Sequence, residues 1–385
     1  MSEVKLNYPP EYFEDIPKEK FAKVQENQQL FDETFQTKPI GFFKDVLMRF
    51  CKNRASIVAF AIICVIVFMA IVGPFMNPYS YREQNLDFVD MPPRIQALKW
   101  MDLFDGSSVL KARRMEYLSD PSRYPEGCVI RTFNEKEIRG VKVADVEVDY
   151  YKYLGLSDDV NFWFGTDQYG RDIWTRLWRG VRVSLIIAVV AVMAEVIIGV
   201  IYGAIAGYYG GKVDIIMMRI CEIIRSVPNV IVCTMFMMML GAGMGTMIIA
   251  LVVRGWVPTA RMIRTQFLRF KNREYVMAAQ TMGVPDRKLI FRHILPNAIG
   301  PIITRTMIAI PGAIFMESFL AYIGLGLPSP EPSIGTMLSD AQSTLLIHPT
   351  QTLFPALLIS VLMIAFNLCS NGLRDAFDPT QRGTE

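Results

Sequence analysis

Three charged side chains inside long apolar segments of this sequence are candidates for a functional role. They are Glu195, Arg305 and Glu317. An ionisable group inside such a segment usually faces the interior of a helix bundle, a partner group or a water-filled path. Arg305 and Glu317 would lie about 18 Å apart along a helix, so they cannot pair within it. Each of the three is a candidate for lining a path or for bracing neighbouring helices, and the sequence leaves both roles open.

Residues for covalent or metal chemistry are scarce. Of the 385 residues only His293 and His348 are histidines, and the six cysteines show no CxxC spacing. A metal site or a Ser-His-Asp triad needs such residues in convergent positions. The sequence also lacks the Gly-x-x-x-x-Gly-Lys-Ser/Thr loop that cradles ATP. We therefore expect no catalytic residue, no metal and no cofactor bound by this chain, and a role other than that of an enzyme.

The apolar residues come in blocks long enough to cross a membrane. Hydrophobic residues make up 52% of the chain and charged residues 20%, and about 20 apolar residues span a bilayer core. The net charge of +3 gives no reason to expect a nucleic-acid partner. We expect an all-α polytopic membrane protein with six transmembrane helices, at residues 57–75, 183–208, 213–240, 246–258, 297–324 and 353–369. Residues 213–240 are expected to form one long helix.

Basic residues define the expected orientation. Four of them lie between residues 44 and 54, before the first span, and five lie between 261 and 273. Lys and Arg are enriched on the cytoplasmic side of membrane proteins, so both segments are expected inside. Six spans then place both termini in the cytoplasm, with 1–40 as an N-terminal tail, 41–76 as an interfacial helix and the first span, and 380–385 as a C-terminal tail.

A polar insert separates the first two spans, at residues 77–164. Residues 140–150 alternate between apolar and polar side chains, as a half-buried strand does. Residues 127–133 are suited to pair with this strand across 134–139. We expect a small extracellular α+β subdomain here, followed by a core of five further transmembrane helices at 165–379.

The segment from Arg273 to Pro296 is polar and basic although it lies between apolar spans. Gly283 suits the left-handed end of one short helix. Pro285 blocks its continuation, and Asp286 is placed to cap a second short helix. Two short helices separated by a glycine outside the membrane form a segment that another protein can bind.

This segment resembles the cytoplasmic EAA loop of ABC-importer permeases. Ala278, Ala279 and Gly283 match the family pattern, and so do Leu295 and Pro296, whereas Met277 stands where the family usually has Glu. In that family the loop docks into a groove on a separate ATPase subunit. The resemblance thus implies an ATPase-coupling loop within residues 261–297, whose candidate residues are Glu274, Ala278, Ala279, Gly283, Asp286, Leu295 and Pro296.

A second stretch, Phe164–Asp172, resembles the Phe-Gly-Thr-Asp-x-x-Gly-Arg-Asp signature of the C-type subunit in oligopeptide and dipeptide importers. From its residues alone it is a glycine-hinged turn in which Asp167, Arg171 and Asp172 are able to pair locally. Near the C-terminus, Leu373–Pro379 resembles a further motif of that family. The motif residues to which we assign a structural role are Gly165, Thr166, Asp167, Gly170, Arg171, Asp172 and Asp375.

Together these resemblances imply the membrane subunit of a type I, MetI-like ABC importer of the bacterial cell membrane, forming half of a path for oligopeptides or dipeptides. They also imply its partners: a second homologous permease, two ATPase subunits that carry ATP and Mg²⁺, and an extracellular peptide-binding lipoprotein. An importer of nickel or another small solute stays an alternative. A secondary transporter is a less favoured one, because no inverted repeat is evident.

Overall fold

The structure is a computed structural model that describes residues 41–138 and 140–377. The chain divides into two units, residues 1–45 and 46–385. Only residues 41–45 of the first unit are described, and helix α1 (Phe42–Lys52) begins there and continues into the second unit. The tails predicted at 1–40 and 380–385 lie outside the described residues.

The first apolar helix is α2 (Arg54–Val72), and it confirms the first predicted helix. The side chain of Asn53 caps it by accepting the backbone N–H of Ser56 at 3.3 Å. α2 packs along α12 (Pro349–Phe377). Gly372 of α12 allows this close approach, because a Cβ there would overlap the Ser56 side chain.

A three-stranded antiparallel sheet follows in the insert, in the order β1-β3-β2. The strands are β1 (Ser107–Arg114), β2 (Val129–Ile138) and β3 (Val141–Asp149). Val146 and Val148 are fully buried between half-buried neighbours, which confirms the predicted alternation. The predicted pairing of the two later strands is also correct, although β2 runs further toward β3 than expected, through a register shift after Phe133.

Strand β1 was not predicted. Most of its side chains are exposed, so it has no apolar periodicity that the sequence alone can reveal. Backbone pairing with β3 holds it in place instead. Short helical turns surround the sheet, at Leu86–Phe88, Gln96–Leu98, Met115–Tyr117 and Tyr150–Tyr153 (α3).

Helix α4 (Ile173–Tyr209) is the longest helix described, and it begins ten residues before the predicted start of its span, at 183. It packs closely on α7 (Met244–Phe270) along the strip formed by Gly199, Gly203 and Gly207. A Cβ at Gly207 would stand 2.6 Å from Cβ of Phe267. Larger residues in this strip would therefore push the two helices apart.

The predicted continuous helix over 213–240 is wrong. Two helices stand there, α5 (Gly211–Ser226) and α6 (Asn229–Leu240), bent by 79° at the break. Val227 is extended before Pro228, because proline disfavours the helical conformation of the residue before it and donates no N–H.

Helix α7 also extends further than the predicted span. It continues through Pro258 to Phe270, so basic residues placed in the loop, such as Arg261 and Arg264, belong to its last turns. The segment after it forms α8 (Glu274–Thr281), α9 (Asp286–Lys288), a π-helical turn (Leu289–Ile294) and a 3-10 turn (Leu295–Ala298). The helices α10 (Ile299–Leu320), α11 (Ile334–Gln342) and α12 follow.

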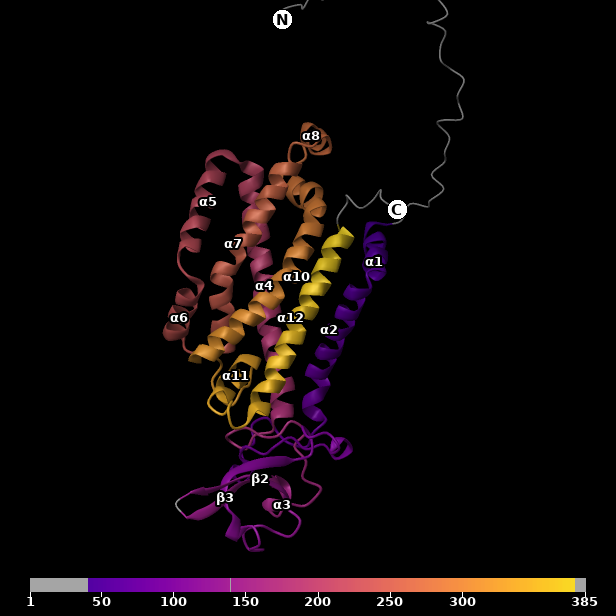
Figure 1. Ribbon diagram of the computed structural model, residues 1–385. Helices are drawn as coiled ribbons and strands as arrows, with labels where there is room; N and C mark the ends of the chain where they lie inside the picture. Colours follow the sequence, from indigo (N-terminus) through magenta and orange to yellow (C-terminus); the bar gives the residue numbers. More distant parts are fainter. Residues whose placement is uncertain (1–40, 139, 378–385) are drawn as a thin grey trace, which may run out of the picture. The chain divides into compact units, whose positions relative to one another are not determined.

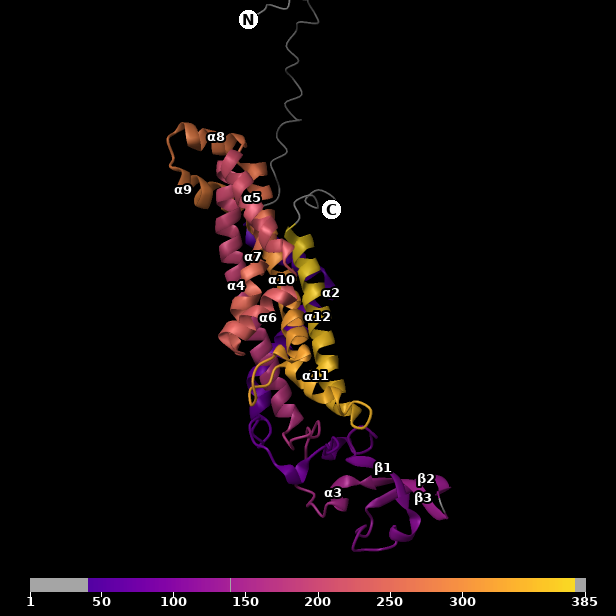
Figure 2. The same cartoon turned by 90° about the vertical axis from the view of Figure 1, so that its left-hand side faces the viewer.

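The described part of the chain holds five helices long and apolar enough to cross a membrane, or six spans if the broken pair α5–α6 counts as one. In both views the sheet lies at the end of the helices where α2 ends and α4 begins, and α8 lies at the opposite end (Figures 1 and 2). We refer to these as the sheet end and the loop end.

Candidate functional site

At the loop end, α8 closes with a turn that requires a glycine. Gly283 has φ +76°, and its N–H donates to the carbonyl of Gln280 at 2.9 Å. The N–H of Val284 donates to the carbonyl of Ala279 at 3.2 Å. This pair of bonds satisfies carbonyls that the helix end leaves free. The predicted helix end at Gly283 is thus confirmed, and the turn redirects the chain into α9.

One side of α8 is anchored to the helix bundle, and the other is open. Val276 and Ala279 are buried in a cluster with Ile263 and Phe267 of α7. The side chain of Met282 is 76% exposed, and Met277 and Ala278 are exposed as well. The loop is therefore held rigidly on α7 while it presents an apolar face on the outside. We call Tyr275, Met277, Ala278 and Met282 the open face of α8.

Asp286 does not cap the second short helix as predicted, since α9 has no side-chain cap. Its carboxylate instead accepts the hydroxyl of Tyr208 at 2.7 Å. Tyr208 lies in the last turn of α4, so this bond ties the loop to a second helix. Nearby, Asn297 donates to the hydroxyl of Tyr275 at 3.0 Å. Leu295 is half-buried, whereas Glu274 and Pro296 are exposed.

At the sheet end, the segment 165–172 forms a tight turn just before α4. Gly165 and Gly170 have φ +79° and +68°, and a Cβ on either would overlap a carbonyl of the insert, that of Met91 or that of Asn85. The hydroxyl of Thr166 accepts the N–H of Met91 at 2.8 Å and donates to the carbonyl of Phe88. The turn is thus fixed against the insert by its glycines and its threonine.

The carboxylates of this turn have separate tasks. Asp172 caps α4 by accepting the N–H of Thr175 at 2.8 Å. Asp167 accepts the backbone N–H groups of Tyr169 and Arg171, at 2.9 and 3.0 Å, and Nε of Arg171 at 2.7 Å. The predicted local pairing therefore joins Asp167 to Arg171, whereas Asp172 bonds to the helix start.

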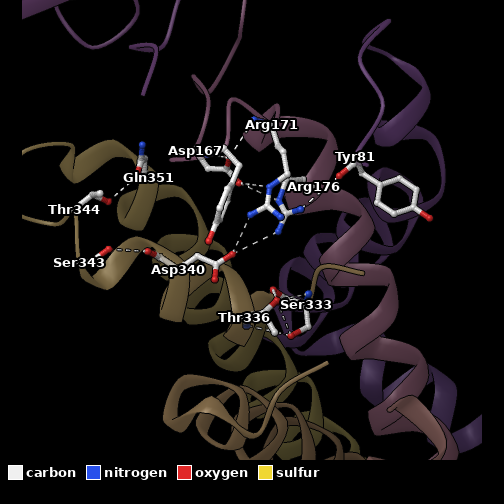
Figure 3. A network of polar contacts seen from close by, with 11 residues as sticks. Tyr81, Asp167, Arg171, Arg176, Ser333, Thr336, Asp340, Ser343, Thr344 and Gln351 are labelled. Atoms are coloured by element: carbon white, nitrogen blue, oxygen red, sulfur yellow. Dashed lines mark hydrogen bonds and ion pairs between the residues drawn. The ribbon is translucent and has the colours of Figure 1, made fainter. Parts of the chain in front are cut away.

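A four-residue network extends from this turn to α11 (Figure 3). We call Asp167, Arg171, Arg176 and Asp340 the sheet-end network. Arg176 lies 3.5 Å from Asp167, and both guanidinium groups reach Asp340, at 3.2 Å from Arg171 and 3.6 Å from Arg176. The arginine side chains are 3% and 4% exposed, against 38% for Asp340. The network thus joins the start of α4 to the short helix between α10 and α12.

Glu331 forms a second clamp beside this network. Its carboxylate accepts the hydroxyl of Tyr81 at 2.9 Å and pairs with Arg179 and Arg82, each at 3.3 Å. Burial alone would raise the pKa of Glu331, but these partners together lower it. The loop before α11 is therefore bound to α4 and to the insert through a charged carboxylate.

The three charged groups inside the spans lie in different surroundings. Glu195 of α4 is 9% exposed and lies against Gly255 of α7. Glu317 of α10 is fully buried and accepts the hydroxyls of Ser184, at 2.8 Å, and Ser318, at 3.3 Å. Within the described residues, Nε of Arg305 is buried without a hydrogen-bond partner. Glu195 and Glu317 therefore sit at helix contacts, as the bracing alternative requires.

Comparison with known proteins connects these features. The family described as "Binding-protein-dependent transport system inner membrane component" matches residues 199–383, and that described as "N-terminal TM domain of oligopeptide transport permease C" matches residues 41–93. The oligopeptide transport system permease protein OppC of Bacillus subtilis is 35% identical over 96% of this chain and 99% of its own length. The chain belongs to the permease C family of oligopeptide and dipeptide ABC importers.

Other relatives of the permease agree. The dipeptide transport system permease protein DppC of Bacillus subtilis is 34% identical over 97% of this chain and 96% of its own length. A solved inward-facing structure of the MetNI methionine ABC transporter is 18% identical, with a TM-score of 0.42, and the match covers 51% of this chain and 96% of that chain. The relationship to OppC and DppC makes the permease a multi-pass membrane transport subunit, and this family does not favour the nickel or secondary-transporter alternatives.

The sequence alone missed half of the sheet-end network. Arg176 had no recognisable partner, because Asp340 stands 164 positions later in the chain. Asp375, to which its motif assigned a structural role, is exposed near the end of α12. In the described part of the permease, no group of three or more His, Cys, Asp or Glu side chains is arranged to hold a metal ion.

Burial changes the acidity of two carboxyls at the sheet end. It raises the pKa of Asp172 to about 6, although hydrogen bonds to Thr175 oppose the shift. Burial also raises the pKa of Asp340, against the opposing charges of Arg176 and Arg171. The permease therefore holds two carboxyls near its sheet end whose charge is less stable than that of an ordinary surface aspartate.

Proposed function

We propose that the permease forms half of the translocation path of an ATP-driven importer for oligopeptides or dipeptides, and that the open face of α8 is where an ATPase subunit grips it. The observation that carries the proposal is the division of α8. Its buried side is packed on α7, while Met277, Ala278 and Met282 stay uncovered. The named substrates of the relatives, oligopeptides and dipeptides, support the substrate class.

The proposed orientation places the loop end in the cytoplasm and the sheet end, with residues 77–164, outside the cell. Counting α5–α6 as one broken span gives six spans and brings both termini to the cytoplasm of a bacterium. The basic residues in the last turns of α7 favour this orientation. The segment 261–297 then serves as the coupling region, and residues 165–379 as the transmembrane core.

In this proposal, partner proteins supply the energy for transport and capture the substrate. A second homologous permease completes the path, two ATPase subunits bind ATP with Mg²⁺, and an extracellular peptide-binding lipoprotein delivers the substrate. The permease itself binds no cofactor and catalyses no reaction. Its sequence has no phosphate-binding loop, which supports a division of labour between subunits.

The structure provides a rigid link for such a mechanism. Movement of α8 would be transmitted to α7 through Val276 and Ala279, and to α4 through the bond between Tyr208 and Asp286. Because α4 and α7 pack closely along the glycine strip, they would move together. ATP favours one orientation of these helices only if the ATP-bound subunits bind that orientation more tightly. Glu195, Arg305 and Glu317 are proposed to brace these helices or line the path between them.

Substitutions on α8 test the proposal. Ala278 is exposed, so Ala278→Asp leaves the core intact but places a charge in the open face. We expect peptide uptake to be lost, with normal membrane insertion and with the ATPase subunits no longer co-purifying. Ala278→Ser, which is small and uncharged, is the matched control and should retain uptake. Normal uptake by Ala278→Asp would contradict the proposed role of α8.

A further inference from the structure

A polar cavity of about 310 Å³ opens beside the sheet-end network. Its wall includes Arg171, Arg176 and Asp340, together with Ser329 and Ser339. Figure 3 shows the guanidinium groups of Arg171, in the turn before α4, and of Arg176, in α4, directed toward Asp340 on α11. Pockets for drug-sized ligands measure roughly 300–1,000 Å³. This cavity therefore has room for one end of a short peptide rather than for a long chain.

The two arginines of the wall are suited to a carboxylate. A guanidinium presents N–H donors in a planar fork that matches the two oxygens of a carboxylate. Both side chains are almost entirely buried, and both residues line the cavity. Their positions are thus set by the surrounding protein before any ligand arrives, which reduces the entropy lost on binding.

Asp167 and Asp340 hold these two arginines with unequal strength, and Glu331 also lines the cavity. Asp167 is fixed by two backbone N–H groups in addition to Nε of Arg171. Asp340 contacts the guanidinium groups at the longer distances of 3.2 and 3.6 Å, and its side chain is 38% exposed. An incoming carboxylate would therefore displace Asp340 and leave Asp167 in place.

We propose that this cavity binds the C-terminal carboxylate of a short peptide, which replaces Asp340 on Arg171 and Arg176. The inference rests on the proposed function, because it names the part of a peptide substrate that the permease recognises. In the absence of peptide, Asp340 keeps both buried arginines paired, since a buried charge without a partner is strongly destabilising. Asp340 is thus a competitor built into the site, and its removal strengthens binding.

Equilibrium binding of radiolabelled trialanine tests the site. The full-length permease is purified with its co-purifying subunits in lipid nanodiscs, and trialanine amide, which lacks the terminal carboxylate, is the control ligand. Asp340→Asn should bind trialanine about two- to five-fold more tightly, as expected for loss of a partly exposed competing charge. Arg176→Gln should weaken trialanine binding by at least about the same factor. Neither substitution should change the binding of the amide.

Opposite changes in trialanine affinity in the two variants distinguish a peptide-binding site from an ion pair that only joins α4 to α11. Both variants lose such an ion pair, so trialanine affinity would change in the same direction in both or stay unchanged. Either result overturns the proposal. Failure of the wild-type permease to bind trialanine overturns it as well. If Arg176→Gln does not fold, Arg176→Lys keeps the charge but loses the fork, and it should still bind trialanine more weakly than the wild type.

If the proposed import function is wrong, the binding and transport experiments give a different pattern. In that case vesicles that contain the wild-type assembly and ATP would not accumulate trialanine, while the opposite shifts in binding would remain. The carboxylate site would then stand without peptide import. Accumulation of trialanine together with equal shifts in both variants would instead retain the importer and reject the site.

Discussion

Glu195 of α4 lies against the backbone of Gly255 of α7, and no side chain larger than hydrogen fits at position 255 without moving that carboxyl. The contact lies at the interface of α4 and α7, which pack closely along the glycine strip. The carboxyl of Glu195 thus occupies the space that a side chain at position 255 would need.

Gly255→Ala should therefore weaken the packing of α4 on α7 and lower the stability of the permease. The added methyl group would overlap Oε1 of Glu195, and overpacking of a filled interior typically costs about 1–3 kcal/mol. We expect a lower midpoint of thermal unfolding in detergent and reduced uptake. Gly312→Ala in α10 is the matched control, because a Cβ there meets nothing within 4 Å. Equal stability of the two variants would show that α4 and α7 are not tightly packed at Glu195.

Glu317 should act through its hydrogen bonds rather than through a negative charge. It is fully buried, and in the described part of the chain it accepts hydrogen bonds from the hydroxyls of Ser184 and Ser318 rather than pairing with a cation. Glu317→Gln keeps the shape and an accepting oxygen, so it should retain most of the stability and uptake. Glu317→Ala should lose about 2 kcal/mol or more, because it leaves a cavity and unpaired hydroxyls. Unfolding in detergent compares the two, and equal loss in both would indicate that the charge itself matters.

Stability should depend on the protonation of Asp172. Its pKa is raised from 3.8 to about 6 in the folded permease, chiefly by burial. The folded state then binds more protons than the unfolded state between these values, so the free energy of unfolding falls as the pH rises from 3.8 through about 6. The total change is on the order of 3 kcal/mol.

The measurement is the pH dependence of unfolding in detergent, compared between the wild type and Asp172→Asn. The variant cannot titrate at this position but keeps an oxygen for the N–H of Thr175. Its stability should fall less steeply across the same pH range. Parallel curves for the two proteins would rule out Asp172 as the titrating group.

Met277→Glu should leave folding and membrane insertion intact. Met277 is 48% exposed in the open face of α8, so a charged side chain there remains in contact with water. Ala279→Asp in the same helix would bury a charge against Phe267 and should impair folding. The amount of protein in the membrane distinguishes the two. Loss of membrane insertion by Met277→Glu would show that this face is covered within the chain itself.

The sequence predicted the features that depend on local chemistry. The helix end at Gly283 and the turn at Gly165–Asp172 both follow from residues close together in the chain. The β2–β3 pair was predictable because β3 has an alternating apolar face. The general class, a helical protein with several membrane spans, follows from the apolar blocks.

Features that depend on distant residues could not be predicted in this way. The pairing of Arg176 with Asp340, the contact of Glu195 with Gly255 and the bond from Tyr208 to Asp286 join separate helices, and no pattern near either partner reveals them. The break at Pro228 is different. Its signal was local, but the apolar character of residues 229–240 outweighed it in the prediction.

The most direct test of the central claim is purification of the tagged permease from its native membrane in mild detergent, with the co-purifying chains identified by mass. We expect two ATPase subunits and a second permease to co-purify with the wild type and with Ala278→Ser, and the ATPase subunits to be lost from Ala278→Asp. A permease that purifies alone and still transports peptide when reconstituted would contradict it.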